Sequence, residues 1–541
     1  MTKIETFNIA ARLAQWADQK PESVALIEMR SGRQRTFKEL EQESSRLASG
    51  LIQFGMKSGE RVLLMVPYGI DFVTLTFAMF KAGLIPVLID PGLGKKNILK
   101  CIKQVQPHGM IAIPLAHAIK RIFPGTFKSI QHNVTVGTRW FWGGASLNKL
   151  LDSGKTDFKM ASMEKEHPAA ILFTSGSTGP AKGVLFSHGI FNHQVKILQE
   201  QFDIQPDETD LPTFPLFGLF SSGLGMTSII PDMDSTKPAH VDPKNIIVPI
   251  QNFKISSSFG SPALWDTVSQ YCLDQNIQLP TLKRIIMAGG PVSGDLLARF
   301  ETIIDKGCKI YTPYGATEVL PVSLIDRREI LDETWSLSNQ GKGTCVGHPI
   351  PGVEIKIIEI SDQPILKWQD VTESGTNIVG EIAVKAEWAT RTYFNRQDLT
   401  QLAKIEDGNS FWHRMGDLGR LDEKNRLWFY GRKNQRVVTE FETLYTIPCE
   451  AIFNQHPDVK RSALVGIGYK TKPVIIIEPV ERIKSQAARQ KFTAELLERG
   501  AKSSLTQSIT KVLFHEEFPV DVRHNAKIFR EKLSLWAENQ K

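Results

Sequence analysis

Cysteine is scarce in this chain, and nothing in its placement indicates metal binding or disulfide bonding. The 541 residues include five cysteines, which are far apart and form no C-x-x-C pair. This spacing argues against a zinc site and against a disulfide framework. We therefore expect a reducing, cytoplasmic location. The five are Cys101, Cys272, Cys308, Cys345 and Cys449.

Long apolar runs and a strong excess of charge are also lacking. The N-terminal 22 residues carry Glu5 and Asp18 and lack the apolar core of a signal peptide. The most apolar helix candidate, 72–82, is too short to span a bilayer. Lysine and arginine exceed aspartate and glutamate by 65 to 58, and we expect this net charge of +7 to be spread along the chain. It favours anionic small molecules as ligands rather than nucleic acid.

The sequence does contain alternating helix and strand patterns. Residues 36–55 carry a capping box in Thr36 and Glu39, an apolar stripe, and Gly55 as a stop. A short buried-strand pattern, a helix pattern and a second strand pattern follow at 61–67, 72–82 and 84–90. This order predicts a parallel sheet and an α/β fold.

A change of pattern after Gly347 predicts a β-rich subdomain, because short apolar runs at 354–360, 380–386 and 426–431 resemble antiparallel strands. The remainder has its own order of hairpin, helix, two strands and a long charged helix. We therefore expect an α/β protein, α+β overall, in two domains. A large N-terminal domain, 1–421, would have mixed sheets with flanking helices, and a small mobile α+β domain would span 422–541.

A loop of glycine and hydroxyl residues, LFTSGSTGPAKGV at 172–184, has the composition of a phosphate-binding backbone. It is not a Walker A motif, because Ala181 replaces the second glycine and Gly183 stands where a serine or threonine would bind magnesium. A G-x-S-x-G nucleophile elbow is absent from the sequence as well. Kinase-like and hydrolase chemistry therefore lose support.

Four motifs in a fixed order resemble those of the adenylate-forming superfamily, which contains acyl-CoA synthetases, luciferases and peptide-synthetase adenylation domains. They are TSGSTGPAKG at 174–183, YGATE at 314–318, RMGDLGRLDEKNRLWFYGRK at 414–433 and HNAKIFREKL at 524–533. Longer stretches, such as LYTIPCEAIFNQHPDV, resemble the branch of olefin-pathway β-lactone synthetases and fatty-acid CoA ligase-like proteins. The resemblance covers nearly the whole chain.

The resemblance implies a site for ATP and Mg²⁺. Glu318 would bind the metal, whose hard charge prefers oxygen ligands, and Thr317 would face the α-phosphate. Gly289, Gly290, Pro291 and Tyr314 would frame the adenine, and Gly315 and Ala316 would also belong to the nucleotide site. The β- and γ-phosphates would be held by Thr174, Ser175, Gly176, Ser177, Thr178, Gly179 and Lys182.

The resemblance also implies roles for four later residues. Asp417 would accept hydrogen bonds from both ribose hydroxyls, and Arg432 would contact ribose or phosphate. Lys527 would reach the reacting carboxylate and α-phosphate from the small domain, although Ala526 replaces the usual preceding glycine. Asp422 takes the hinge position. A turn aspartate, a surface glutamate and a solvated arginine are the plainer alternatives for Asp417, Glu318 and Arg432.

Two departures from the acyl-CoA synthetase pattern concern the second half-reaction. In GRKNQRVVTEFETLY, Asn434 replaces an aspartate, and no glycine precedes Leu444 beside the expected pantetheine tunnel. Phe217 stands where many relatives have a histidine in the acyl channel, with simple core packing as the alternative.

We expect an enzyme that uses ATP and Mg²⁺ to activate a fatty acid, preferably a 3-hydroxy fatty acid, as acyl-AMP, and then closes a β-lactone. Formation of a fatty acyl-CoA thioester is the first alternative, so a role for CoA stays open. The second alternative, from another class, is a catalytically inactive nucleotide-binding protein. No nucleic-acid partner and no transmembrane segment are expected.

Overall fold

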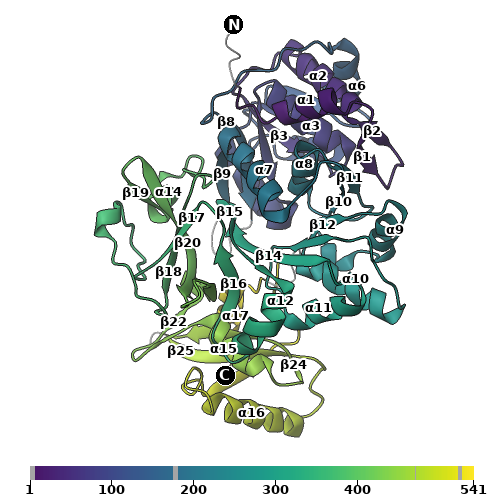
Figure 1. Cartoon of the computed structure of the whole chain (residues 1–541). Helices are drawn as coiled ribbons and strands as arrows, with labels where there is room; N and C mark the ends of the chain where they lie inside the picture. Colours follow the sequence, from purple (N-terminus) through teal and green to yellow (C-terminus); the bar gives the residue numbers. More distant parts are fainter. Residues whose placement is uncertain (1–5, 175–180, 469–470, 522–526, 541) are drawn as a thin grey trace.

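The computed structural model describes residues 6–174, 181–468, 471–521 and 527–540. Figure 1 shows a large body built from two extended sheets, with a small C-terminal domain beneath it. No helix in the described ranges combines the length and apolar character needed to cross a membrane.

A seven-stranded sheet forms the N-terminal part of the large body. Its strands are parallel except for the last, which runs antiparallel to its neighbour. This confirms the parallel sheet predicted from the alternating pattern. In spatial order the strands are β7 (Ala145–Ser146), β6 (His132–Thr135), β5 (Gly109–Ala112), β3 (Arg61–Met65), β4 (Ile85–Ile89), β8 (Pro168–Thr174) and β9 (Lys182–Ser187).

Helices cover both faces of this sheet and form separate cores with it. α2 (Phe37–Gln53), α3 (Ile70–Lys81) and α6 (Leu147–Ser153) pack in one core, whereas α4 (Lys95–Val105) and α5 (Pro114–Ile122) pack in the other. The predicted capping box begins α2: the Thr36 hydroxyl accepts from the Glu39 amide at 3.2 Å, and the Glu39 carboxylate accepts from the Thr36 amide at 2.8 Å.

A fourteen-stranded sheet forms the rest of the large body, and its first half includes parallel strands. Helices α9 (Lys244–Asn252), α10 (Pro262–Asp274) and α11 (Gly294–Arg299) pack on it. In spatial order its strands from one edge are β2 (Gln34–Thr36), β1 (Val24–Glu28), β11 (Thr227–Ile230), β10 (Thr209–Pro212), β12 (Ser257–Gly260), β13 (Arg284–Met287) and β14 (Lys309–Ala316).

The second half of the same sheet is antiparallel, as the short runs after Gly347 predicted. These strands continue the large sheet rather than forming a sheet of their own. They are β15 (Val319–Asp326), β16 (Thr344–Pro349), β21 (Leu427–Arg432), β20 (Ser410–Leu421), β18 (Gly380–Ala386) and β17 (Val353–Ile358), with β19 (Lys404–Asp407) paired to β20.

The C-terminal domain has its own three-stranded sheet and two cores. Its order of elements is the predicted one: a short hairpin, a helix, two strands and a long charged helix. They are β22 (Val437–Val438), β23 (Thr443–Leu444), α15 (Thr446–Asn454), β24 (Val459–Ile467), β25 (Lys472–Pro479), α16 (Gln486–Ala501), β26 (Lys511–Phe514) and α17 (Arg530–Glu538).

The chain passes from the large sheet to the small domain after β21. Asp422 lies in the turn between β20 and β21, where its carboxylate accepts from the Arg426 guanidinium and the Trp428 indole, each at 2.8 Å. β21 still pairs with β20 and β16, whereas the small-domain core begins at Val437. A boundary at 421/422 with Asp422 as hinge stays a prediction.

Candidate active site

The YGATE segment lies at the tip of the hairpin of β14 and β15. β14 runs through Gly315 to Ala316, and the turn is made by Thr317 and Glu318. Glycine is needed at 315 because a Cβ there would lie 2.6 Å from the Val319 carbonyl oxygen. The close packing of the two strands brings the ends of the motif into one site.

Tyr314, Asp417 and Arg432 form one group that is joined by a hydrogen bond and an ion pair. Asp417 and Arg432 lie on the adjacent strands β20 and β21, whereas Tyr314 lies on β14, beyond β16 and β15 in the sheet. The Tyr314 hydroxyl donates to one oxygen of Asp417 at 2.6 Å, and the Arg432 guanidinium lies 2.7 Å from the other. Asp417 and Arg432 are direct partners across β20 and β21. Burial raises the pKa of Asp417, and Arg432 and Tyr314 oppose that rise. The group presents a carboxylate and a guanidinium in fixed positions.

The MAGGP segment follows β13 and lies beside this group. β13 and β14 are parallel, with Ile286 opposite Tyr311, so the segment after Met287 runs next to Tyr314. Gly289 has a φ of +98°, in the left-handed region that favours glycine. Gly289, Gly290 and Pro291 therefore lie at the carboxyl end of a parallel strand, where open α/β sheets bind ligands.

Glu318 is held by a residue that the sequence did not single out. The Tyr393 hydroxyl donates to a Glu318 oxygen at 2.5 Å, and the Lys182 ammonium lies 4.9 Å from the centre of the Tyr393 ring. Burial alone raises the pKa of Glu318, but the surrounding basic groups and the Tyr393 hydrogen bond hold it below its ordinary value. Burial lowers the pKa of Lys182. An ionised carboxylate and a lysine thus share one site.

The sequence analysis did not identify two further basic residues that lie beside Glu318. Lys404 and His413 are buried partners across β19 and β20, and both act on the charge of Glu318. Burial lowers the pKa of Lys404 to about 7 and that of His413 to about 3. The Lys404 ammonium has no hydrogen-bond partner among the described residues.

A sequence signal for this pair was present. The stretch EDGNS contains a glycine and an asparagine between two short strand patterns, which is typical of a tight hairpin. Asp407 pairs with Ser410 around that turn, and Gly408 has a φ of +58°. Counting outward from the turn places Lys404 opposite His413.

The phosphate-loop prediction is only partly within the described structure. Thr174 and Lys182 are backbone partners across β8 and β9, so the loop between them begins and ends at one place. Ser175, Gly176, Ser177, Thr178 and Gly179 lie outside the described residues.

Lys527 belongs to the small domain. Its backbone carbonyl accepts from the Asp521 amide at 2.9 Å, and the next residue, Ile528, packs in a small-domain core. The reach of Lys527 to the group around Glu318 therefore stays a prediction.

The donor set suits a magnesium ion that is bound together with a nucleotide. In the described part of the chain, no group of three or more His, Cys, Asp or Glu side chains could hold a metal by itself. Mg²⁺ is commonly bound by one or two carboxylates together with substrate phosphates. Glu318 provides one ionised carboxylate beside Lys182, so the residues fit a metal that arrives with phosphate.

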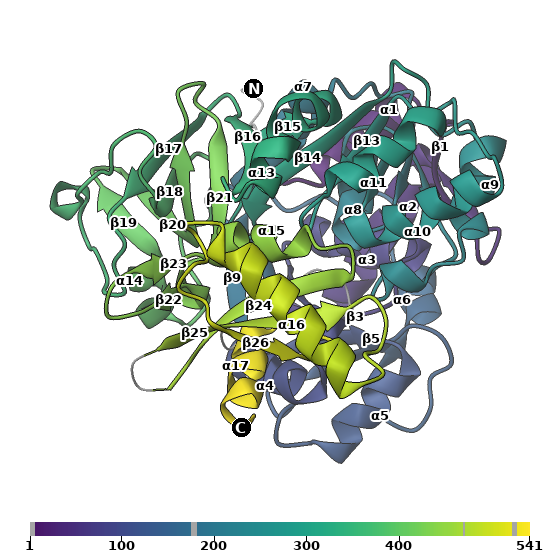
Figure 2. The ribbon, with the colours of Figure 1, turned by 90° about the horizontal axis from the view of Figure 1, so that it is seen from below.

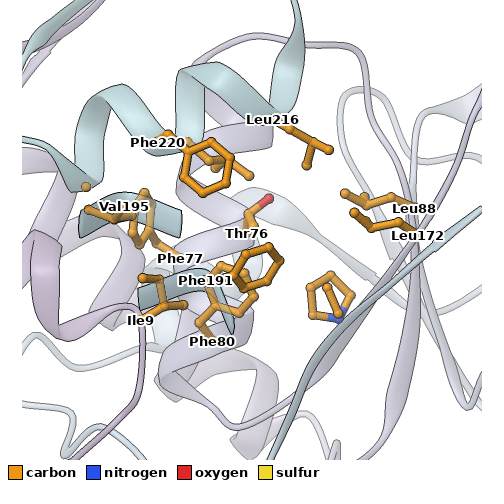
Figure 3. A pocket seen from close by; sticks show the side chains of 14 residues that line it. Ile9, Thr76, Phe77, Phe80, Leu88, Leu172, Phe191, Val195, Leu216 and Phe220 are labelled. Carbon is orange, nitrogen blue, oxygen red and sulfur yellow. The ribbon is translucent and has the colours of Figure 1, made fainter. Parts of the chain in front are cut away.

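An apolar cavity lies between α3, α7 (His188–Phe202), α8 (Pro215–Gly223) and the sheet (Figure 3). The cavity proper has a volume of about 30 Å³, and the wider space between its walls, about 500 Å³, includes the part open to solvent. Phe217 is not among its lining residues and instead stacks on Phe259, with ring centres 3.4 Å apart. Side chains in Figure 3 that point into the cavity include Phe77, Phe80, Leu88, Leu172, Val195, Leu216 and Phe220.

Comparison with known proteins agrees with this architecture. The model of the AMP-binding enzyme family matches residues 13–394. Proteins named olefin beta-lactone synthetase from Xanthomonas campestris pv. campestris and Stenotrophomonas maltophilia are 41% and 40% identical to this chain. The first match covers 99% of this chain and 98% of the relative, and the second covers 98% of each. A long-chain-fatty-acid–CoA ligase of Thermus thermophilus is 23% identical over 82% of this chain and 80% of the relative.

Solved structures share the fold. An anthranilate CoA ligase in complex with anthranoyl-AMP superposes with a TM-score of 0.77 at 19% identity, over 98% of each chain. ATP-bound MatB from Rhodopseudomonas palustris does so with a TM-score of 0.79 at 18% identity, over 99% of each chain. The family match, the two full-length relatives and this shared fold lead to one conclusion: the chain belongs to the AMP-binding, adenylate-forming enzyme family and is an acid-activating ligase of the AMP-forming type.

Proposed function

We propose that this enzyme activates a 3-hydroxy fatty acid with Mg-ATP and then closes a β-lactone. In the first step the carboxylate oxygen bonds to the α-phosphorus and pyrophosphate leaves. In the second, the 3-hydroxyl oxygen bonds to the acyl carbon, its proton is released and AMP leaves. Holding the hydroxyl beside the activated carbonyl makes the four-membered ring accessible.

The group around Asp417 supports nucleotide binding. A buried carboxylate accepting from Tyr314 and paired with Arg432 provides oxygens for the ribose hydroxyls and a cation near the phosphates. The loop at Gly289, Gly290 and Pro291 would frame the adenine. Glu318 would hold Mg²⁺, with Thr317 facing the α-phosphate.

The basic residues support charge compensation during adenylation. Lys182 and Lys404 lie near Glu318, where negative charge would gather on pyrophosphate. We propose that Lys404 is a phosphate-site residue, because a buried ammonium without a hydrogen-bond partner gains the most from a polyanion. Lys527 would complete the site when the small domain swings about Asp422.

The apolar cavity supports a hydrocarbon chain as part of the substrate. Its lining is almost wholly aliphatic and aromatic, with Thr76 as an exception (Figure 3). Such a wall gains free energy from burying methylene groups, about 0.8 kcal/mol for each. A fatty acid therefore suits the cavity better than a small polar acid.

The observation that carries the lactone product is the full-length likeness to two relatives named olefin beta-lactone synthetase, at 41% and 40% identity. A β-lactone is the internal ester of a 3-hydroxy acid, so this likeness supports a 3-hydroxy fatty acid as substrate. A cytoplasmic location stays a prediction.

Thioester formation with CoA is the second candidate function, favoured by the more distant likeness to a fatty-acid CoA ligase. The segment that lines a pantetheine tunnel in such ligases is here a short hairpin of β22 and β23. Its tip carries Glu440, Phe441 and Glu442, and the Phe441 side chain is exposed. Two carboxylates at this place would repel the phosphates of CoA, which weighs against the ligase.

Product analysis by mass spectrometry tests the proposal. The enzyme is given ATP with a 3-hydroxy fatty acid or the matched plain fatty acid, each with and without CoA. We expect steady AMP release from the 3-hydroxy acid without CoA, and a product lighter than the acid by one water. Accumulation of an acyl-CoA, with turnover that stalls until CoA is added, would establish the ligase instead. ATP binding without pyrophosphate release from any acid would indicate an inactive binder.

A further inference from the structure

The positive charge of this protein is concentrated in one segment, contrary to the even spread expected from composition. Between Asp90 and Asp152 the chain has nine Lys and Arg residues and no Asp or Glu. This excess is larger than the net charge of +7 of the whole chain. The nine residues are Lys95, Lys96, Lys100, Lys103, Lys120, Arg121, Lys128, Arg139 and Lys149.

These cations have no carboxylate partners within the part of the chain that the structure describes. Those that form hydrogen bonds do so with neutral groups. Lys120 donates to the Asn133 amide oxygen at 2.6 Å, Arg121 to the Phe141 carbonyl at 3.2 Å and Arg139 to the Gly144 carbonyl at 2.9 Å. Their charge is therefore not neutralised by neighbouring side chains.

Large apolar side chains are exposed in the same segment. The interfacial patch, as we define it, consists of five side chains that are between 44 and 81% exposed. They lie on and just after α5 and on the loop 137–144. The five are Leu115, Ile122, Phe123, Trp140 and Phe141.

The loop 137–144 packs along α5 and is hydrogen-bonded to it, so the interfacial patch is one continuous surface. Trp142 stacks on His117 of α5 with ring centres 5.4 Å apart, and its indole donates to the Thr135 hydroxyl at 2.9 Å. The bond from Arg121 to Phe141 joins the far end of α5 to the loop. Trp140 and Phe141 are thus held outward, each packed on one side by Trp142.

The basic helix α4 lies on the same side of the sheet as α5, and Figure 2 shows both along the lower edge of the molecule. α4 buries Cys101, Ile102 and Val105 and exposes Lys95, Lys96, Lys100 and Lys103. Most of the nine cations therefore surround the interfacial patch or lie on the neighbouring helix.

We propose that this face docks on the surface of an anionic lipid bilayer. Tryptophan and phenylalanine side chains insert at the level of the headgroups, and lysine and arginine near the surface are attracted to anionic lipids. Contiguous exposed apolar area rimmed by charge marks an interaction site. Fatty acids partition into bilayers, so docking would bring the enzyme to its proposed substrate.

The same features disfavour other occupants. A symmetric second copy would place two sets of unneutralised cations against each other. Single-stranded nucleic acid is bound by stacking on aromatic rings, a contact that aliphatic Leu115 and Ile122 cannot make.

Vesicle sedimentation tests the proposal. We expect the full chain to sediment with phosphatidylglycerol–phosphatidylcholine vesicles, weakly with phosphatidylcholine alone, and less at high salt. The double variant W140S/F141S and the charge reversal K128E/R139E should each lower the partition coefficient at least about tenfold.

Two matched controls should leave the partition coefficient unchanged. I378S/L535S alters exposed apolar residues elsewhere on the protein, and K367E/K484E alters exposed lysines elsewhere. ATP affinity and the thermal midpoint show that the variants are folded.

The proposal is wrong if the chain does not sediment with anionic vesicles, or if the patch variants sediment as the wild type does. A concentration-dependent dimer in light scattering that W140S/F141S abolishes would assign the patch to a second copy. If the wild type binds an oligonucleotide but no vesicles, and only K128E/R139E loses that binding, the basic residues would be a nucleic-acid site instead.

Discussion

Lys404 and His413 are direct partners across β19 and β20, so two buried basic side chains leave the sheet on the same side, next to Glu318. Burial lowers the pKa values of both, to about 7 and about 3. Keeping an ammonium there without a hydrogen-bond partner costs free energy in the described structure. A bound polyphosphate would offset that cost.

Proton uptake on ATP binding should reveal that Lys404 becomes protonated beside the phosphates. With a pKa of about 7 in the free protein, the amine is mostly neutral near pH 8. A polyanion beside it raises the pKa, so binding of ATP should take up close to one proton. Calorimetry in two buffers of different ionisation enthalpy measures this number. Lys404→Met should abolish the uptake, whereas Lys356→Met, which alters an exposed lysine paired with Glu373, should retain it. Equal uptake in both variants would contradict the assignment.

The same lysine should make stability depend on pH. Its folded pKa lies below the unfolded value of 10.5, so the unfolded chain binds the proton more tightly. The free-energy cost of burying the charged Lys404 is therefore fully present below about pH 7. It disappears as the pH rises toward 10.5, the pKa of the lysine in the unfolded chain. Lys404→Met should therefore raise the free energy of unfolding near neutral pH by roughly 2 kcal/mol or more, and the gain should shrink in alkaline buffer. Denaturant titrations across pH measure it, and a gain independent of pH would indicate a packing effect.

Asp417 should matter for ATP binding before any chemistry. Asp417→Asn removes the charge that pairs with Arg432 and weakens an acceptor for the ribose hydroxyls, so we expect ATP affinity to fall at least about tenfold. Calorimetry without acid is the measurement. Asp266→Asn, which alters a surface carboxylate paired with Arg299, is the control. Unchanged affinity in Asp417→Asn would remove this residue from the nucleotide site.

Lys527 should act in the transition state rather than in binding. Lys527→Ala should lower acyl-adenylate formation by at least about 10²-fold and leave ATP affinity nearly unchanged, because charge compensation is lost while the nucleotide groups remain. Pyrophosphate release in a single turnover measures the effect. Lys532→Ala, five residues further along, should be silent. An unaltered rate in Lys527→Ala would reject its role.

The apolar cavity should determine which length of acyl chain the enzyme accepts in its substrate. A Cβ at Gly223 would lie 3.8 Å from the nearest atom, a methyl of Val195, so the position tolerates a side chain that occupies cavity space. Gly223→Leu should lower kcat/KM at least about tenfold for a long 3-hydroxy acid and much less for a short one. The control is Gly125→Leu, at an exposed loop position with open space around it. Equal losses of kcat/KM for both acids would show that the hydrocarbon chain of the substrate binds outside this cavity.

The sequence alone predicted the local elements and the family. Strand and helix periods, the Thr36 capping box and the order of the small-domain elements are local patterns, so they are visible before the chain folds. The four motifs identified the superfamily because glycine, carboxylate and lysine spacings are tied to phosphate chemistry. The concentration of charge in 91–151 was equally visible in the sequence, but the overall composition concealed it.

The tertiary structure alone decided which residues meet. Tyr393, Lys404 and His413 join Lys182 and Glu318 because separate strands come together, and a period of two or 3.6 residues carries no information about such distant pairs. The hairpin register was readable in the sequence and would have paired Lys404 with His413, although that prediction was not made, and only the folded sheet placed them at Glu318. Whether an apolar side chain lines the cavity, as Val195 does, or stays exposed, as Phe141 does, depends on what covers it. That covering is decided by packing across the whole molecule, because burial is a property of the folded surface and not of the residue.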